Sequence, residues 1–348
     1  MKKLITILFL TIIMASLLFE NTNAQENQKL AQSGFKFLSV TSDARGAAMA
    51  EAMTSLQIGS SALFYNPAGM ADMSTFLEVS GSTNKWIADI NHYAFSLAVN
   101  PFNGDYGVFG LSAQLVNYGD FYGTVVNRQS PQGYDDTGIF TVSALAIGFG
   151  YAKNITDRFS VGGQVKWIRQ DLGESFIPVN IRVNPSDEKD RIADTITTGN
   201  KLSPLVFDFG TQFRTGIKSL VFGMSVRNFS KEVKYVDEGI QAPMVFTLGI
   251  SMDVMDLINL IDEFPLEQSL NVALDASHYK DHPEQIKLGL DYKLMNMLSL
   301  RLGYSSNNSE NSFTYGLGIT KYGFGFDYAY TPFGVFDNVQ RFTFRFNY

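Results

Sequence analysis

Apolar side chains recur at every second position through most of this 348-residue chain, and this alternation constrains the fold more than any other feature. Residues 341–348 show it plainly, with an aromatic side chain at each alternate position up to the end of the chain. A period of two is that of a β-strand, whose successive side chains point to opposite faces of a sheet. The pattern therefore predicts an all-β fold whose strands have one apolar face and one polar or glycine-rich face.

The alternating pattern predicts fourteen strands downstream of residue 74. They lie near residues 75–83, 90–100, 105–117, 138–152, 159–170, 204–214, 220–229, 244–252, 269–278, 284–293, 298–304, 311–320, 322–330 and 340–348. An even number of antiparallel strands is typical of bacterial outer-membrane barrels. The sequence therefore predicts a transmembrane antiparallel β-barrel formed by residues 75–348.

The connections between the predicted strands support a barrel that crosses a membrane. Those after odd-numbered strands are mostly long and polar, as at 119–137, 171–203 and 230–243, whereas those after even-numbered strands are mostly short. Long external loops and short periplasmic turns are typical of outer-membrane barrels. We expect residues 171–203 to form an exposed, mobile loop, and residues 253–268, which break the rule, to contain a short helix.

A soluble all-β sandwich would have the same period, with its apolar face inward and a charged face outward. The polar face of these segments is rich in glycine rather than in lysine and glutamate, and only 18% of all residues are charged. Aromatic residues also gather near strand ends on the apolar face, as in the girdles of membrane barrels. These observations favour an outer-membrane location, with membrane lipid around the barrel.

The first 24 residues have the features of a secretory signal peptide. Lys2 and Lys3 give a basic start, residues 4–19 are mainly apolar, and Ala24 precedes Gln25. A non-cleaved anchor helix is the alternative, but the apolar run is short for a membrane span and polar residues follow it. We expect cleavage after residue 24 and, because the chain has no cysteine, no disulfide in the exported protein.

Composition and motifs argue against several classes of function. A net charge of −7 argues against a nucleic-acid-binding surface. The glycines of residues 148–150 and 316–318 lie inside predicted strands and lack the spacing of a dinucleotide-binding loop. We therefore expect no cofactor.

The three histidines do not form a recognisable metal or catalytic site. His278 and His282 flank Asp281 in a short predicted loop, where a metal would need a further ligand. His92 and Ser96 share a predicted strand, but no third group that would orient the histidine can be named. We therefore expect no catalytic residues and no metal.

Residues 25–74 precede the alternating region and do not alternate. Small residues around Ala47 predict a short, tightly packed helix close to Asp43 and Arg45. Fifty residues rich in small side chains are the right size to fill the lumen of a barrel. The sequence thus divides into a signal peptide (1–24), a lumen segment (25–74) and the barrel.

A turn signal closes this segment at Asn66, Pro67, Ala68 and Gly69. Proline fixes φ, and glycine permits positive φ, so the four residues are suited to join the lumen segment to the first strand. The alternative is that these motifs merely end a helix and start a strand, without forming a plug.

The polar face of the predicted barrel carries more basic than acidic residues. The basic ones are Lys166, Arg214, Arg227, Lys287, Lys293, Arg301, Arg341 and Arg345, and the acidic ones are Asp208, Asp275, Asp291 and Asp327. Lumen charges ordinarily pair with each other, with water or with an internal plug. The alternative is that the basic excess binds the carboxylate or phosphate head of an amphiphile. We expect Asp43 to be held by one of the wall arginines, with Arg227, Arg301, Arg341 and Arg345 as candidates.

Two motifs of the lumen segment resemble those of a known group of proteins. Residues 62–71, ALFYNPAGMA, resemble the Asn-Pro-Ala-Gly hatch motif of FadL-like outer-membrane channels, and residues 37–50, FLSVTSDARGAAMA, resemble the amino-terminal signature of the PorV/PorQ family. Similarity to that family's later strands is found in residues 115–124, 158–170 and 327–344. The resemblance implies a fourteen-stranded barrel with an amino-terminal hatch inside it. It departs at Ala50 and Glu51, where the family usually carries glycine.

The resemblance implies two alternative functions. In the first, which we take as the main hypothesis, the chain is a non-enzymatic accessory barrel of type IX protein secretion. Secretion-system proteins or exported cargo would then dock on external loops such as 171–203 and 230–243. In the second, the chain is similar to FadL-like channels and passes hydrophobic small molecules through the hatch region and sideways into the membrane. A structural membrane protein with neither activity is a third possibility, because a fold does not determine a function.

Overall fold

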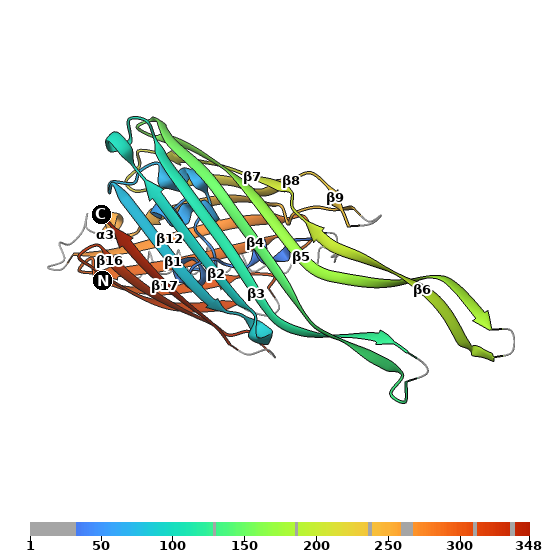
Figure 1. The fold of residues 1–348 in the computed structure, drawn as a ribbon. Helices are drawn as coiled ribbons and strands as arrows, with labels where there is room; N and C mark the ends of the chain where they lie inside the picture. The colour runs from blue at the N-terminus through green and yellow to red at the C-terminus, as the bar shows by residue number, and fades with distance from the viewer. Residues whose placement is uncertain are drawn as a thin grey trace.

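The computed structural model describes residues 33–348, apart from residues 128–129, 185–186, 236–238, 259–266, 309–311 and 335–337. The predicted signal peptide and residues 25–32 lie outside this described part. Most of the described residues form long, tilted strands that close into a barrel (Figure 1).

The wall of the barrel consists of fourteen antiparallel strands within the described residues. They are β1 (Leu77–Lys85), β2 (Asn91–Val99), β3 (Val108–Val126), β4 (Tyr134–Thr156), β5 (Phe159–Asn184), β7 (Leu205–Arg214), β8 (Val221–Ser230), β11 (Val245–Asp253), β12 (Gln268–Tyr279), β13 (Gln285–Leu294), β14 (Leu298–Ser305), β15 (Phe313–Lys321), β16 (Phe324–Thr331) and β17 (Val339–Asn347). Each strand pairs with its neighbours, and β1 pairs with β17 to close the ring. The predicted strand number and the antiparallel barrel are confirmed.

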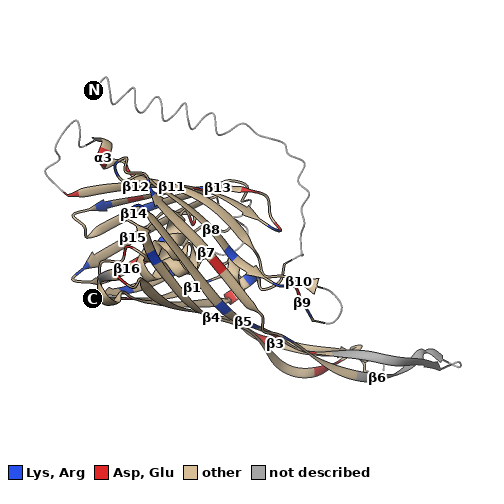
Figure 2. Cartoon of the chain, turned by 90° about the horizontal axis from the view of Figure 1, so that it is seen from above, with Lys and Arg blue, Asp and Glu red and all other residues tan. Residues whose placement is uncertain are grey.

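The outer face of the wall is apolar and the inner face is polar. On β14, Leu298, Leu300 and Leu302 are 45%, 54% and 50% exposed, whereas Ser299 and Arg301 between them are each 3% exposed. Figure 2 shows that most strand residues are neither acidic nor basic. A soluble sandwich would bury the leucines instead, so this distribution is that of a barrel surrounded by lipid.

Two ribbons extend the barrel at one end (Figure 1). Beyond the last residue paired with β2, β3 and β4 continue together, and β5 continues in pairing with β6 (Asp187–Leu202). The expectation of loops at 119–137 and 171–203 is therefore wrong. The second connection contains an alternation that its many polar residues obscure. β-branched residues, which favour strands, occupy alternate positions there at Ile177, Val179, Ile181 and Val183.

The other connections are shorter than the two ribbons. Within 230–243, β9 (Val233–Lys234) and β10 (Gly239–Ile240) form a small hairpin, and α3 (Met255–Ile258) is the short helix expected after β11. The connections after β1 and β2 contain the 3-10 turns η4 (Ile87–Asp89) and η5 (Pro101–Gly104). None of the helices in the described part of the chain has the length and apolarity needed to cross a membrane.

Residues 33–74 fold as a series of short helices against the inner face of the wall. These are η1 (Lys36–Ser39), α2 (Ala44–Ala48), η2 (Gly59–Phe64) and η3 (Pro67–Met70). Helix α2 contacts β14 to β17, η2 contacts β1 to β3, and η3 contacts β4, β5 and β7. Because these strands lie on different sides of the ring, the segment lies within it, as the blue ribbon of Figure 1 shows. We call residues 33–74 the lumen segment below.

Candidate functional site

Helix α2 begins at Asp43, whose carboxylate caps the helix. Its Oδ1 accepts a hydrogen bond from the backbone N–H of Gly46 at 2.8 Å, and the residue is only 2% exposed. Burial raises the pKa of Asp43 above its ordinary value, although the bond from Gly46 opposes this effect. Among the described residues, no ion pair joins Asp43 to an arginine. A direct ion pair with a wall arginine is therefore not found there, and the backbone N–H of Gly46 at the start of the helix binds the carboxylate instead.

Arg45 joins the lumen segment to the wall by charge. Its Nη2 lies 3.1 Å from Asp291, which also accepts a hydrogen bond from Arg301 Nε at 3.1 Å. Arg301 Nη1 lies 2.6 Å from Asp327, and Arg345 Nε lies 2.8 Å from the same carboxylate. Five alternating charges thus run from α2 into the wall. Because the side chains of Asp291 and Asp327 are at most 1% exposed, each carboxylate depends on its cations for stability.

Two further predicted wall charges bind the backbone of the lumen segment. Asp275 Oδ2 accepts hydrogen bonds from the backbone N–H groups of Met53 and Thr54 at 3.1 and 3.0 Å. Arg227 Nη1 donates to the carbonyl oxygen of Phe64 at 2.6 Å. These residues satisfy backbone groups that the irregular segment leaves without partners of its own.

The Asn-Pro-Ala-Gly motif forms the start of η3 and fixes it to the wall. The side-chain oxygen of Asn66 accepts from the backbone N–H of Ala68 at 3.1 Å, and its amide nitrogen donates to the carbonyl of Thr211 on β7 at 3.0 Å. The glycine has a different role from the one expected. Gly69 has no positive φ, but a side chain there would approach the carbonyl oxygen of Leu56 to 2.8 Å. The turn needs the small size of Gly69 rather than its conformational freedom.

The chain leaves α2 through two residues in the left-handed region. Ala50 has φ 49° and Glu51 has φ 64°, which glycine adopts without strain. They are the positions where the sequence departs from the glycines of the resembling family. Lys287 Nζ donates to the Glu51 carboxylate at 2.7 Å, and the Thr41 hydroxyl also donates to it. Burial would raise the pKa of Glu51, but the charges of Lys287 and Arg227 outweigh burial and hold this pKa at about 2.

A cavity of about 800 Å³ lies between the lumen segment and the loops at the ribbon end of the barrel. Its floor includes Ala47, Ala50 and Glu51 of the lumen segment. Its rim includes the exposed residues His282 and Asn307, from the connections after β12 and β14. A volume of this size accommodates a small organic molecule.

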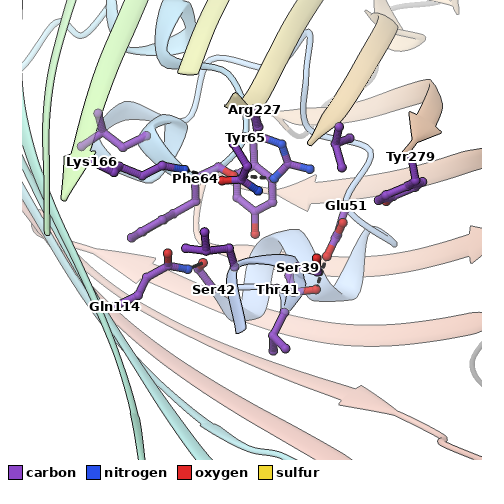
Figure 3. A pocket seen from close by; sticks show the side chains of 15 residues that line it. Ser39, Thr41, Ser42, Glu51, Phe64, Tyr65, Gln114, Lys166, Arg227 and Tyr279 are labelled. Carbon is purple, nitrogen blue, oxygen red and sulfur yellow. Dashed lines mark hydrogen bonds between the residues drawn. The ribbon is translucent and has the colours of Figure 1, made fainter. Parts of the chain in front are cut away.

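A second cavity, of about 20 Å³, shares part of its lining with the first, and Figure 3 shows the side chains that line it. Both cavities are lined by Thr41, Glu51 and Tyr279, so these side chains separate them. Inside the small cavity, the guanidinium of Arg227 lies 5.9 Å from the ring centre of Tyr65. This space is large enough for about one water molecule.

An aromatic corner of the large cavity was not identified from the sequence. Trp86, just after β1, packs edge-to-face against Phe333 with ring centres 5.0 Å apart. The guanidinium of Arg341, on β17, lies 5.3 Å from the centre of the Trp86 ring. Trp86 and Arg341 lie far apart in the sequence, and the pairing of β1 with β17, which closes the ring, brings them together.

The histidines singled out in the sequence take part in local contacts. His282 Nδ1 lies 2.7 Å from Asp281, which also binds Lys36 of the lumen segment, and His278 pairs with Glu284 at 3.0 Å. Burial opposes ionisation of Asp281, but the Lys36, Ser33 and His282 side chains outweigh it and hold its pKa at about 2. No group of three or more histidine, aspartate or glutamate residues that could hold a metal is found in the described ranges.

His92 and Ser96 do not act on each other. The ring of His92 packs against Trp86 with centres 6.1 Å apart, whereas the Ser96 hydroxyl donates to Ser60 of the lumen segment at 2.9 Å. Residues four apart on one strand share a face but lie about 13 Å apart, which is too far for a hydrogen bond.

Solved structures with this fold include two toluene transporters and a FadL homologue. The toluene transporter TbuX of Ralstonia pickettii matches with a TM-score of 0.55 and 13% identity, over 88% of this chain and 98% of its own. The toluene transporter TodX of Pseudomonas putida has a TM-score of 0.55 and 12% identity, over 87% and 96%. A FadL homologue from Pseudomonas aeruginosa has a TM-score of 0.53 and 12% identity, over 88% and 98%.

The chain has the fold of the FadL-like channels. Together with the apolar outer wall, this fold places it in an outer membrane, as predicted. No protein-family model matches the sequence, and neither does any curated protein. Membership of the PorV/PorQ family is therefore not confirmed, and identities this low show a common fold only.

Proposed function

We propose that this chain is a FadL-like channel through which small hydrophobic molecules cross the outer membrane from the outside. The observation that carries the proposal is the cavity of about 800 Å³, which opens among the loops at the ribbon end and has the lumen segment as its floor. A molecule that enters from this side meets a site of ligand size before it meets the segment.

The lumen segment would act as a plug that keeps the barrel from being an open pore. Three features support this role: its helices contact strands around the ring, Arg45 enters the buried charge network, and Asp275 and Arg227 bind its backbone. The fit is close at several points. At Gly162 of β5, for example, an added side chain would come within 2.5 Å of the backbone of Pro67. We propose that residues 25–74 form this plug as a unit.

The fold neighbours favour uptake over secretion. TbuX and TodX are described as toluene transporters, and neither description mentions protein export. The main hypothesis from the sequence, an accessory role in type IX secretion, has no support from these comparisons, so we do not propose it.

Uptake of labelled toluene by cells that lack hydrocarbon channels of their own tests the proposal. Cells that produce the chain should accumulate toluene faster than cells with an empty vector. Gln285→Trp, at the cavity wall, should slow this uptake because the larger side chain fills part of the cavity. Glu284→Trp is the matched control, since the Glu284 side chain is 74% exposed and contacts His278 instead. Equal uptake with and without the chain would refute the proposed function.

A further inference from the structure

The residues that line the large cavity include one more cation than carboxylates. Its charged residues are Lys36, Glu51, Asp281, Lys287 and Arg341, with histidine taken as neutral. Lys36 pairs with Asp281, and Lys287 pairs with Glu51 at 2.7 Å. Three cations against two carboxylates leave one cation over. Within the described residues Arg341 makes no ion pair, so Arg341 is that cation.

The guanidinium of Arg341 is only partly used by the protein. Its Nη1 donates to the Thr331 hydroxyl at 3.0 Å, while its Nε is buried and has no hydrogen-bond partner in the described part of the chain. A guanidinium can pair with both oxygens of a carboxylate through two of its N–H groups. Because Arg341 is 2% exposed, water compensates for little of this lost bonding.

A second unpartnered polar side chain lies directly beside Arg341. Asn84 is the partner of Arg341 in the pairing of β1 with β17, and it is 1% exposed. Neither its amide nitrogen nor its amide oxygen has a hydrogen-bond partner among the described residues. Asn84 is not among the residues that line the cavity, so of this pair only Arg341 can contact a molecule bound there.

We propose that this cavity binds a small aromatic monocarboxylate, whose carboxylate pairs with Arg341 and whose ring packs against Trp86 and Phe333. The inference rests on the proposed function and names the class of molecule that enters. One uncompensated cation calls for a single negative charge, since a neutral hydrocarbon would leave Arg341 unpaired and a dianion would leave a negative charge unpaired.

The walls of the cavity also argue for a ring rather than a long alkyl chain. Trp86 and Phe333 offer aromatic surface in one corner, next to the arginine. Elsewhere most of the lining residues are polar, among them Ser39, Thr41 and Gln285. A compact ring buries its apolar surface in the aromatic corner alone, whereas a long chain would extend along polar walls.

Trp86 provides the signal for a binding experiment. The chain has two tryptophans, and the other, Trp167, is 39% exposed on the outer wall, so Trp167→Phe leaves Trp86 as the reporter. Phenylacetate, toluene and phenethylamine are titrated into this full-length variant in detergent, and the fluorescence change is followed. Phenylacetate should bind at least about tenfold more tightly than either of the other two probes. Equal affinity for phenylacetate and toluene would overturn the inference without any further variant.

Substitutions of the arginine sharpen the test. In the Trp167→Phe background, Arg341→Gln should weaken phenylacetate binding at least about tenfold and leave toluene binding unchanged, because only the carboxylate contacts the guanidinium. Arg341→Lys keeps the charge but cannot donate two parallel hydrogen bonds to a carboxylate. Its affinity for phenylacetate should therefore lie between those of the parent and Arg341→Gln. Arg214→Gln, a lumen arginine that pairs with Asp72 at the opposite end of the barrel, is the control and should bind as the parent does. Unchanged phenylacetate affinity in Arg341→Gln would refute the proposed site.

The two proposals fail separately. Toluene uptake by cells, combined with no binding of phenylacetate, would overturn this inference and leave the proposed function intact. Tight phenylacetate binding, combined with no passage of toluene or phenylacetate into cells, would confirm the site and contradict the channel.

Discussion

Substitution of Asp291 by asparagine should release the lumen segment from the wall. The Asp291 side chain is 1% exposed and lies 3.1 Å from both Arg45 and Arg301. Asparagine has nearly the same shape but no charge, so the two guanidinium groups would face each other without the carboxylate between them. Removing one partner from such a buried network costs about 3 to 5 kcal/mol.

This loss of free energy predicts a large increase in the fraction of molecules whose lumen segment is detached from the wall. At about 1.4 kcal/mol for each factor of ten, the detached fraction should rise roughly a hundredfold to a few thousandfold. Trypsin offers a direct assay, because it cuts after arginine and Arg45 lies in a buried helix that must detach before it can be cut. Trypsin cleavage at Arg45 should therefore be much faster in Asp291→Asn than in the parent chain, in the same detergent.

The controls separate charge from general damage. Asp171→Asn removes a carboxylate whose side chain is 31% exposed and pairs with Arg169, so its effect on cleavage should be small. Asp291→Asn combined with Arg45→Lys keeps both cations and remains cleavable by trypsin, so it should stay as fast as the single variant. An unchanged rate of cleavage in Asp291→Asn would refute the view that this network holds the segment.

Substitutions at three other residues of the lumen segment give further predictions for stability. Asp43→Ala should lower the free energy of unfolding by about 1 kcal/mol by removing the helix cap, whereas Asp43→Asn keeps an acceptor and should cost little; thermal unfolding distinguishes them. Ala50→Gly should raise the urea midpoint by the equivalent of about 1 kcal/mol because it relieves a φ of 49°, and a lower midpoint would contradict the assigned conformation. The pKa of Glu51 falls from 4.5 to about 2 on folding, so its stabilising contribution is present above pH 4.5 and is lost as the pH falls through 2. Glu51→Gln should remove this part of the acid sensitivity in urea unfolding between those pH values.

The strands were predictable because the membrane imposes their pattern. A wall with lipid outside and a polar lumen inside requires opposite chemistry at successive residues, and this appears in the sequence as a period of two. The two ribbons were missed because they extend beyond the membrane, where lipid no longer requires an apolar outer face. There the only signal is the alternation of β-branched residues, as in Val179 and Val183.

The candidate site was predictable only in part. The wall charges and the small-residue helix follow from local sequence, and the structure brings them together. Their pairing does not follow, because Arg45 and Asp291 are 246 residues apart and their contact depends on the placement of α2 inside the barrel. The same holds for Trp86 and Arg341, which meet through the closure of the barrel. The cap at Asp43 is a local feature, because an aspartate directly before a short helix can accept from the backbone N–H groups of its first turn.

Single-channel conductance of the intact and truncated chains tests the central claim most directly, namely that the amino-terminal segment closes the barrel to ions. The intact chain in a planar lipid bilayer should conduct poorly. The truncated chain lacks residues 25–71 and must still show the heat-dependent gel mobility of a folded barrel. It should open a larger and steady pore, because water would then fill the lumen. Equal conductance of the two folded chains would contradict the plug, and with it the route from the cavity that we propose for hydrophobic molecules.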